Sequence, residues 1–260
     1  MKEKERISSP LSDLHCHILP QIDDGAKDES ISIKMLQIEY QSGVTEIAMT
    51  SHFDCEKISL DNFLKKRFIA KKKLMSEAAL KFKEAANINI KLGAEVYYSP
   101  NLSRIDAGKL CIEGTNFMLM ELPTDRKPPS LDETIYNLQS MGITLLIAHI
   151  ERYPYVMDNL PILCDWIDKG IYTQINAGTI LHKGKQAKIC HKLIDWNLVH
   201  VMASDAHSVD KRHPNLAEGL DLLPGDEKER LVKNANDIFW GVMPEITEIY
   251  CPRRFLVRWI

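Results

Sequence analysis

The sequence predicts an α/β fold built on a parallel β-sheet. Short apolar runs alternate with longer amphipathic stretches along most of the 260 residues, which is the pattern expected of repeated strand–helix units. A second observation concerns the position after each apolar run, because nearly every run is followed by a histidine or a carboxylate. In a parallel sheet or barrel these positions lie on one face. The sequence therefore predicts a fold class and the place of a site.

Seven apolar runs are predicted to be strands, and five amphipathic stretches between them are predicted to be helices. The strands are 11–15, 45–49, 88–93, 116–120, 143–148, 171–175 and 200–203, and the helices are 28–42, 60–86, 131–141, 160–169 and 185–196. Gly43, Gly142 and Gly170 follow three of the helices, where a left-handed C-cap is needed. The tail 214–260 is predicted to form further helix. No linker or repeat is visible, so we expect one domain over 1–260.

Composition and charge narrow the function classes. A 45% hydrophobic content in 260 residues can fill the core of one enzyme-sized domain. The 33 basic and 36 acidic residues are mixed along the chain, so neither nucleic acid nor membrane is an expected partner. The charged N-terminus and the absence of a long apolar run predict a soluble, cytoplasmic protein. The six cysteines form no Cys-x-x-Cys pair and are expected to remain thiols. The sequence makes no prediction of oligomeric state.

The residues at the strand ends are typical of a metal centre. His15 and His17 are two apart on an extended segment, so both imidazoles lie on one side of it. Imidazole and carboxylate ligands together suit a site with two or three divalent ions. A lone histidine is more often structural, but five of the nine histidines occupy matching positions. The candidate residues are His15, His17, His52, Glu95, Glu121, His149, Asn176, Asp205 and His207.

Some of these residues also admit structural interpretations. Glu121 and His149 could cap neighbouring helices or pair with Arg152. Asp23 and Asp24 could form a simple turn before a helix that begins near Asp28, or one of them, with Asp24 preferred, could be a ligand. We interpret the remaining histidines as structural or surface residues; they are His182, His191, His200 and His213.

The motifs resemble the PHP (polymerase and histidinol phosphatase) superfamily, and within it the bacterial manganese-dependent protein-tyrosine phosphatases linked to capsule and exopolysaccharide synthesis. The resemblance extends from about Asp13 to Arg212. Its most specific stretch is DLHCHILPQIDDGAKD at 13–28, followed by AHIERY at 148–153, QINAG at 174–178 and SDAH at 204–207. Two departures are visible: Ser51 and Phe53 flank His52 where the family usually has proline and histidine, and Ile150 replaces a usual proline.

The resemblance implies a distorted (β/α)7 barrel, related to the TIM barrel, with three divalent metal ions. The ions would be manganese, with iron, cobalt or zinc as alternatives, held by His15, His17, Asp24, His52, Glu95, Glu121, His149, Asp205 and His207. Glu95 would bridge two ions, and Asp205 and His207 would bind different ions. The essential arginine would be Arg152, with Arg212 as a second basic residue. The expected partner is a phosphotyrosine protein, namely a bacterial tyrosine kinase.

The chemistry expected of such a site is hydrolysis of a phosphomonoester by a hydroxide that divalent metal ions make available near neutral pH. Arg152 would hold the phosphate oxygens, and His207 is a candidate proton donor to the leaving group. Cys16 follows His15 as in a cysteine-based phosphatase, but Ile22 stands where that signature needs arginine. The remaining alternatives are a histidinol-phosphatase-like enzyme for a small phosphate ester and a non-catalytic metal-binding barrel.

Overall fold

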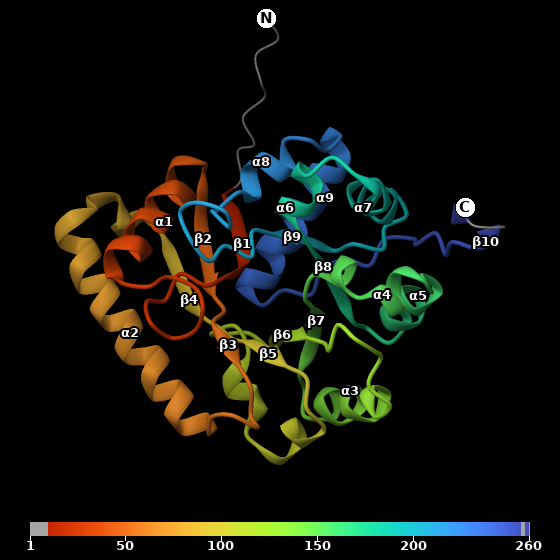
Figure 1. Ribbon diagram of the computed structural model, residues 1–260, viewed down its shortest axis with the longest axis horizontal. Coiled ribbons are helices and arrows are strands. Elements are labelled where there is room, and N and C mark those ends of the chain that lie inside the picture. The colour runs from red at the N-terminus through yellow and green to blue at the C-terminus, as the bar shows by residue number, and fades with distance from the viewer. Residues whose placement is uncertain (1–9, 256–257, 260) are drawn as a thin grey trace, which may run out of the picture.

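The computed structural model describes residues 10–255 and 258–259. Its strands lie at the centre and its helices surround them (Figure 1). The chain has an α/β fold with a curled parallel sheet, as the alternating pattern predicts. Residues 1–9, part of the expected domain 1–260, lie outside the described residues. None of the described helices combines the length and the apolar character needed to cross a membrane.

The parallel strands fall into two hydrogen-bonded groups that follow one another around the curl. The first group has the order β1-β2-β4, and the second has the order β3-β5-β6-β7-β8-β9. A parallel bridge between Cys16 and Ala206 then brings the end of β1 beside the segment that follows β9. The bounds are β1 Leu11–Cys16, β2 Val44–Met49, β3 His52–Phe53, β4 Asn89–Leu92, β5 Glu95–Tyr97, β6 Phe117–Glu121, β7 Thr144–Ile147, β8 Tyr172–Asn176 and β9 Val201–Ala203.

Strands β3 and β5 were not predicted. Each begins shortly after the strand that precedes it in sequence, so β2 leads into β3 and β4 leads into β5. Both pairs remain side by side across the break, because β2 pairs with β4 and β3 pairs with β5. Because β3 pairs with β5, His52 lies directly opposite Glu95. These short strands therefore bring two candidate ligands together.

The five predicted helices are confirmed, with ends that differ by a few residues. They are α1 Glu29–Gln41, α2 Leu60–Lys81, α3 Leu131–Ser140, α5 Pro161–Asp168 and α7 Lys185–Asp195, and the further α-helices are α4 Pro154–Met157, α6 Ala177–Leu181, α8 Leu216–Leu220 and α9 Gly225–Trp240. The Asp28 side chain caps α1 by accepting a hydrogen bond from the Ile31 amide. Gly43, Gly142 and Gly170 adopt positive φ angles of 91°, 81° and 74°, as the sequence predicts.

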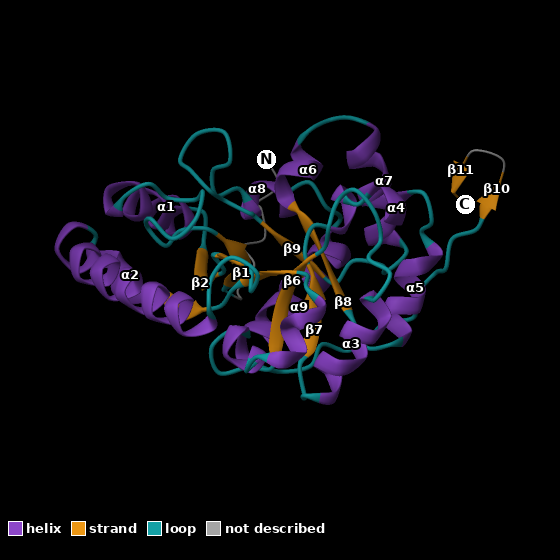
Figure 2. Ribbon diagram, turned by 60° about the horizontal axis from the view of Figure 1, so that its bottom comes forward, coloured by secondary structure: helices purple, strands orange, loops and turns teal. Residues whose placement is uncertain are grey.

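Helix α9 closes the inside of the curled sheet. It packs against β1, β2 and β9, and it crosses behind the strands in Figure 2. Its Ala235, Ile238 and Phe239 join a buried cluster with Leu14 of β1 and Leu146 of β7. This contact removes apolar surface of α9 and of the inner side of the strands from water, which stabilises the fold. The opposite strand ends remain available for polar residues.

Two expectations about the C-terminal part and the cysteines are wrong. The tail is helical only to Trp240; the chain then runs without helix to Arg253 and ends in the antiparallel strands β10 Arg254–Phe255 and β11 Arg258–Trp259. Cys164 and Cys251 are not thiols but form a disulfide, with Cα atoms 6.1 Å apart. Their sequence separation of 87 residues explains why spacing gave no sign of the pair.

Candidate metal centre

The candidate ligands gather at the carboxyl ends of the strands. His15 is the next-to-last residue of β1, Glu121 is the last residue of β6, and His149 and Asp205 follow β7 and β9. His52 and Glu95 open the short strands β3 and β5, which come just after the carboxyl ends of β2 and β4. Most of these side chains are buried, whereas Asp24 is 65% exposed and His52 is 36% exposed. The cluster therefore lies at the end of the sheet with one side open to solvent.

Glu95 lies at the centre of the histidines. One of its oxygens, Oε2, is 3.2 Å from His15 Nε2, 3.2 Å from His17 Nε2 and 2.9 Å from His52 Nδ1. The other, Oε1, is 2.8 Å from His149 Nε2. A carboxylate with its two oxygens turned toward different imidazoles has the geometry needed for a bridging ligand.

Three groups of side chains each bring ligand atoms within 4.8 Å of one another. They are His17, Asp24, His52 and His207; His15, His17 and Asp205; and His52, Glu95 and Glu121. His17 belongs to two groups and His52 to two, while Asp205 and His207 fall in different groups. His149 lies beside the third group, with its Nε2 3.7 Å from Glu121 Oε1.

Three histidines are held by one ring nitrogen and turn the other into the cluster. The Nδ1 atoms of His15, His17 and His207 lie 3.2 Å from Gln174 Oε1, 2.8 Å from Asp23 Oδ2 and 2.9 Å from the Asp205 carbonyl oxygen. These oxygens can accept hydrogen bonds from Nδ1, so each ring is held with its Nε2 turned toward the cluster. Metal-ligating histidines are almost always held in this way.

The two adjacent aspartates have different roles. Asp23 is nearly buried, and it accepts hydrogen bonds from the His17 ring, from the His52 amide at 2.8 Å and from the Gly25 amide at 3.0 Å. Asp24 turns outward, with Oδ1 3.4 Å from both His52 Nε2 and His207 Nε2. Asp24 therefore faces the cluster beside His52 and His207, whereas Asp23 supports the His17 ring.

Asp205 joins the cluster to both candidate arginines. Its Oδ2 is 2.9 Å from Arg152 Nη2, and its Oδ1 is 2.8 Å from Arg212 Nη2. Oδ1 also lies 3.4 Å from His15 Nε2. Arg152 and Arg212 are each about 40% exposed, and Arg212 Nη1 also lies 4.0 Å from Asp24 Oδ2. Two guanidinium groups beside a metal-capable cluster form a site for an anion such as phosphate.

Backbone strain is concentrated in two of these residues. Among the described non-glycine residues, positive φ angles occur at His149 (30°) and Asp205 (53°), and also at Gln21 and Asn197. Such angles cost energy in residues with a side chain. Surrounding hydrogen bonds hold them, since the His149 amide donates to Gln174 Oε1 at 2.8 Å and the Asp205 amide donates to the His15 carbonyl at 2.8 Å.

Sequence reasoning missed Gln174, and it named Asn176 as a candidate at a strand end without assigning it a supporting role. Gln174 accepts from His15 and His149, and its own amide nitrogen donates to Asn176 Oδ1 at 2.8 Å. The Asn176 side-chain amide in turn donates to Asp205 Oδ2 at 2.7 Å, so Gln174 and Asn176 together hold Asp205 in place. Both amides lie in a fully buried strand, and polar residues within an otherwise buried run were the available signal.

Asp13 and Glu39 form a second buried support, which the sequence analysis did not assign. Asp13 Oδ1 accepts hydrogen bonds from the amides of His15 at 3.2 Å and Ser204 at 3.1 Å, which ties β1 to the loop that carries Asp205. Glu39 reaches this position from α1 and is also fully buried. Burial raises the pKa of both carboxyl groups, so a shared proton is favoured.

The electrostatics of the cluster favour cations. Burial lowers the pKa of His17, yet hydrogen bonds to Asp23 and Glu95 outweigh it and raise the pKa to about 10. Burial and the charge of Glu95 raise the pKa of Glu121. Two buried nitrogens, His149 Nδ1 and His207 Nε2, have no hydrogen bond. Closely spaced carboxylates with free imidazole nitrogens are the donor set that divalent ions take, so the residues fit such ions.

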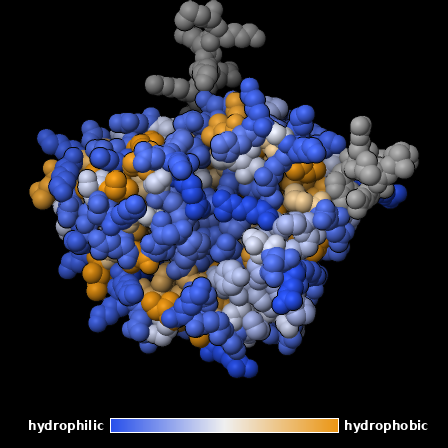
Figure 3. Space-filling model, in the orientation of Figure 1, coloured by the Kyte–Doolittle hydropathy of each residue, from blue (hydrophilic) through white to orange (hydrophobic). Residues whose placement is uncertain are grey.

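Residues left outside the cluster by the sequence analysis remain outside it. His200 is buried beside Thr173, and His191 lies on α7. Cys16 is fully buried with its Sγ 3.5 Å from the Ala48 carbonyl oxygen, and burial raises the pKa of its thiol. A buried thiol with a raised pKa is not a nucleophile, which excludes the cysteine-based phosphatase. The face that carries the cluster is mostly hydrophilic (Figure 3).

Comparison with known proteins identifies the family. Residues 11–240 match the family described as "Capsular polysaccharide synthesis, CpsB/CapC". The chain belongs to this family. Among the curated members, the tyrosine-protein phosphatase CpsB of Streptococcus pneumoniae is 32% identical over 243 residues, which cover 87% of this chain and 94% of CpsB. The tyrosine-protein phosphatase YwqE of Bacillus subtilis (strain 168) is 32% identical over 222 residues, which cover 84% of each chain.

Solved structures agree with this membership of the CpsB/CapC family. A structure from a study of YwqE from Bacillus subtilis and CpsB from Streptococcus pneumoniae, described as "unique metal-dependent tyrosine phosphatases", aligns with a TM-score of 0.84 at 26% identity. The alignment covers 94% of this chain and all of the other. A beta-aspartyl dipeptidase from Fervidobacterium islandicum aligns with a TM-score of 0.50 at 14% identity, over 88% of this chain and 72% of its own. This second likeness is one of fold alone.

Proposed function

We propose that this CpsB/CapC-family chain is a metal-dependent protein-tyrosine phosphatase. The observation that carries the proposal is the set of three histidines held by Nδ1, whose Nε2 atoms turn toward Glu95, Asp24 and Asp205 beside two arginines. The activity follows that of CpsB and YwqE, which are named tyrosine-protein phosphatases. The proposed role is in capsular or exopolysaccharide synthesis, and the proposed substrate is a bacterial tyrosine kinase.

The proposed centre holds three divalent ions, with manganese as the first candidate and iron, cobalt or zinc as alternatives. The ligands would be His15, His17, Asp24, His52, Glu95, Glu121, His149, Asp205 and His207, with Glu95 as the bridge. We further propose that the curled sheet is a distorted (β/α)7 barrel and that the chain 1–260 acts as one domain.

When bound, the ions supply Lewis acidity, which lowers the pKa of water and offsets charge on a phosphate. Arg152 and Arg212 already lie beside Asp205, so their outward donors would bind phosphate oxygens and hold the ester in one orientation. Their charge persists as negative charge spreads over the phosphoryl oxygens during transfer. No side chain has to act as the nucleophile.

His207 is better suited to binding than to proton donation. Burial and the neighbouring charges of His17 and Arg212 lower its pKa to about 4, so its ring would be neutral at pH 7. A tyrosyl leaving group has a pKa of about 10 and needs little help from a general acid. This supports phosphotyrosine as the substrate and makes the proton-donor role of His207 the weaker interpretation.

The experiment measures hydrolysis of a phosphotyrosine peptide and bound metal in parallel, with added Mn²⁺ or with chelator. We expect Arg152→Ala to lower kcat/KM by about 100-fold or more while metal content is unchanged, because it removes donors to the transition state. His149→Ala should lose both activity and metal. Arg253→Ala and His191→Ala, which change exposed or distant side chains, are the matched controls.

Bound metal without hydrolysis of the peptide would contradict the tyrosine-phosphatase assignment. Turnover of histidinol phosphate would then point to a small phosphate ester as substrate, and turnover of neither would indicate a non-catalytic metal-binding barrel. Absence of bound metal in the active native protein would overturn the proposed centre itself.

A further inference from the structure

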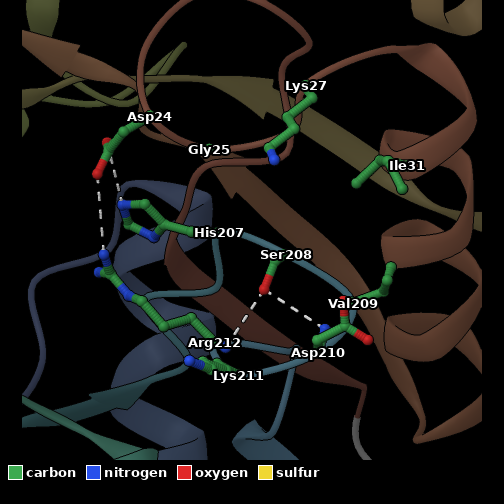
Figure 4. A pocket seen from close by; sticks show the side chains of 10 residues that line it. All are labelled: Asp24, Gly25, Lys27, Ile31, His207, Ser208, Val209, Asp210, Lys211 and Arg212. Carbon is green, nitrogen blue, oxygen red and sulfur yellow. Dashed lines mark hydrogen bonds and ion pairs between the residues drawn. The ribbon is translucent and has the colours of Figure 1, made fainter.

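A hollow beside the metal centre is not used by the proposed chemistry. It has a volume of about 330 Å³ and lies between the 25–31 segment and the 207–212 loop. Asp24, His207 and Arg212 border it at one end (Figure 4). An occupant of the hollow would therefore touch the part of the cluster where the phosphate is expected to bind.

The loop that forms one wall of the hollow is held in place by its own hydrogen bonds. Ser208 Oγ accepts from the Arg212 amide at 3.3 Å and from the Asp210 amide at 3.4 Å, and the His207 amide donates to the Arg212 carbonyl at 2.8 Å. On the opposite wall, the Ala26 amide donates to the His17 carbonyl at 3.0 Å. The hollow is thus bounded by two fixed backbone segments.

The side chains of the hollow combine apolar and basic character. Ile31 and Val209 pack partly against the core and offer an apolar surface. The Lys27 side chain points into the space between the two segments (Figure 4), and Lys211 lies near its other edge. Neither lysine forms an ion pair with another described residue. Arg212 is already engaged with Asp205, and Asp210 is the one acidic side chain away from the cluster.

We propose that this hollow binds an acidic residue that flanks the phosphotyrosine in the substrate protein. The inference rests on the proposed function. A glutamate fits because its methylene groups can contact Ile31 and Val209 while its carboxylate meets Lys27. An extended peptide advances about 3.3 Å per residue, so a residue one or two positions from a phosphotyrosine at the cluster reaches the hollow.

The test uses three phosphotyrosine peptides that differ only in the flanking residues, which are glutamate, glutamine or lysine. The native protein with Mn²⁺ should show a kcat/KM about three to ten times higher for the glutamate peptide than for the lysine peptide, in line with the modest strength of partly exposed ion pairs. The preference should shrink as salt is added, because salt screens the charges.

Lys27→Glu should reverse the ratio of kcat/KM between the glutamate and lysine peptides. Lys27 is chosen for the substitution instead of Lys211, because Lys211 also borders the pocket that contains Arg152 and a change there could affect phosphate binding directly. Lys65→Glu on α2, an exposed lysine away from the hollow, is the matched control and should keep the native ratio. Equal rates for the three native reactions, or an unchanged ratio in Lys27→Glu, would overturn the inference.

Hydrolysis of free O-phosphotyrosine by the native protein separates this inference from the proposed function. Free phosphotyrosine has no flanking residues, so its turnover does not depend on the hollow. If it is hydrolysed while the three peptides react alike, the flanking-residue site alone is wrong. If neither it nor any peptide is hydrolysed with metal bound, the proposed function is overturned, and the inference with it.

Discussion

Asp23 supports the proposed metal site through hydrogen bonds to its neighbours and does not itself face the cluster. It accepts three hydrogen bonds, from the His17 ring and from the amides of His52 and Gly25. The bond to His17 fixes which ring nitrogen faces the cluster and increases its basicity. Asp24, its neighbour in sequence, faces His52 and His207 instead.

Replacing Asp23 should therefore weaken metal binding rather than folding. We expect Asp23→Ala to lower metal affinity by about 10- to 100-fold, the usual effect of losing such a support. Titration of the metal-free protein with Mn²⁺ by calorimetry measures it. Asp165→Ala, which changes an exposed carboxylate on α5, is the control, and equal affinities in the two variants would refute the supporting role.

His200 is a buried histidine outside the centre, and it affects stability through pH. The Thr173 amide donates to its Nδ1 at 3.2 Å, which requires an unprotonated nitrogen. Burial, together with the charge of Arg230, lowers the pKa of His200 to about 3, against 6.5 as its ordinary value. The unfolded chain therefore binds a proton below about pH 6.5 that the folded chain does not bind, so stability falls as pH falls.

The expected loss from this residue between pH 7 and pH 5 is roughly 2 kcal/mol. Urea unfolding of metal-free protein at the two pH values gives the free energies of unfolding. His200→Gln cannot take up the proton and should show a loss that is smaller by about this amount. An identical pH dependence in native protein and variant would show that His200 does not contribute it.

At the scale of elements, the loop between β1 and α1 is fitted closely around His17. A Cβ atom on Gly25 would lie 2.2 Å from the His17 carbonyl oxygen and 2.5 Å from the His17 Cβ. The close approach is fixed by hydrogen bonds from Ala26 to His17 and from Gln21 to Ala26 at 2.9 Å. A glycine is therefore required for Asp23 and Asp24 to reach their partners.

Gly25→Ala should displace this loop and separate the two aspartates from the histidines. We expect at least a tenfold loss of kcat/KM on a phosphotyrosine peptide together with weaker Mn²⁺ binding, because ligand geometry must be kept within a fraction of an ångström. Gly184→Ala is the control, since a Cβ there meets no atom within 4 Å. Unchanged activity in Gly25→Ala would mean that the loop can move without harm.

Over the whole molecule, the centre joins parts of the chain that are far apart in sequence. Its side chains come from elements that range from β1 to the loop after β9. The negative charges of buried Glu95 and neighbouring Glu121 repel one another, and burial together with this repulsion raises the pKa of Glu121. Cations bound only by the folded chain would stabilise it by mass action. Metal binding is thus expected to be coupled to global stability.

Saturation with Mn²⁺ at about 100 times its dissociation constant should add about 2.7 kcal/mol. For a chain of this length that corresponds to a rise in Tm of roughly 5–10 °C over the chelated protein. Thermal unfolding followed by circular dichroism measures the shift, and His149→Ala should show a smaller one. A Tm that is the same with and without metal, in protein shown to bind it, would contradict this coupling.

The sequence by itself determined the fold class, five helices, seven of the strands and the family motifs. These depend on local periodicity and on residue order, which a single chain displays directly. It also placed histidines and carboxylates at the strand ends, because parallel strands all present their carboxyl ends on one face.

Only the tertiary structure decided how those residues meet. It placed Asp23 behind His17 and Asp24 at the cluster, and it placed Arg152 and Arg212 beside Asp205. It also revealed Gln174 and gave Asn176 its place behind Asp205. It also inserted α9 into the curl and joined Cys164 to Cys251. Such contacts depend on strand register, bends and packing between segments that are distant in sequence, and no local pattern encodes them.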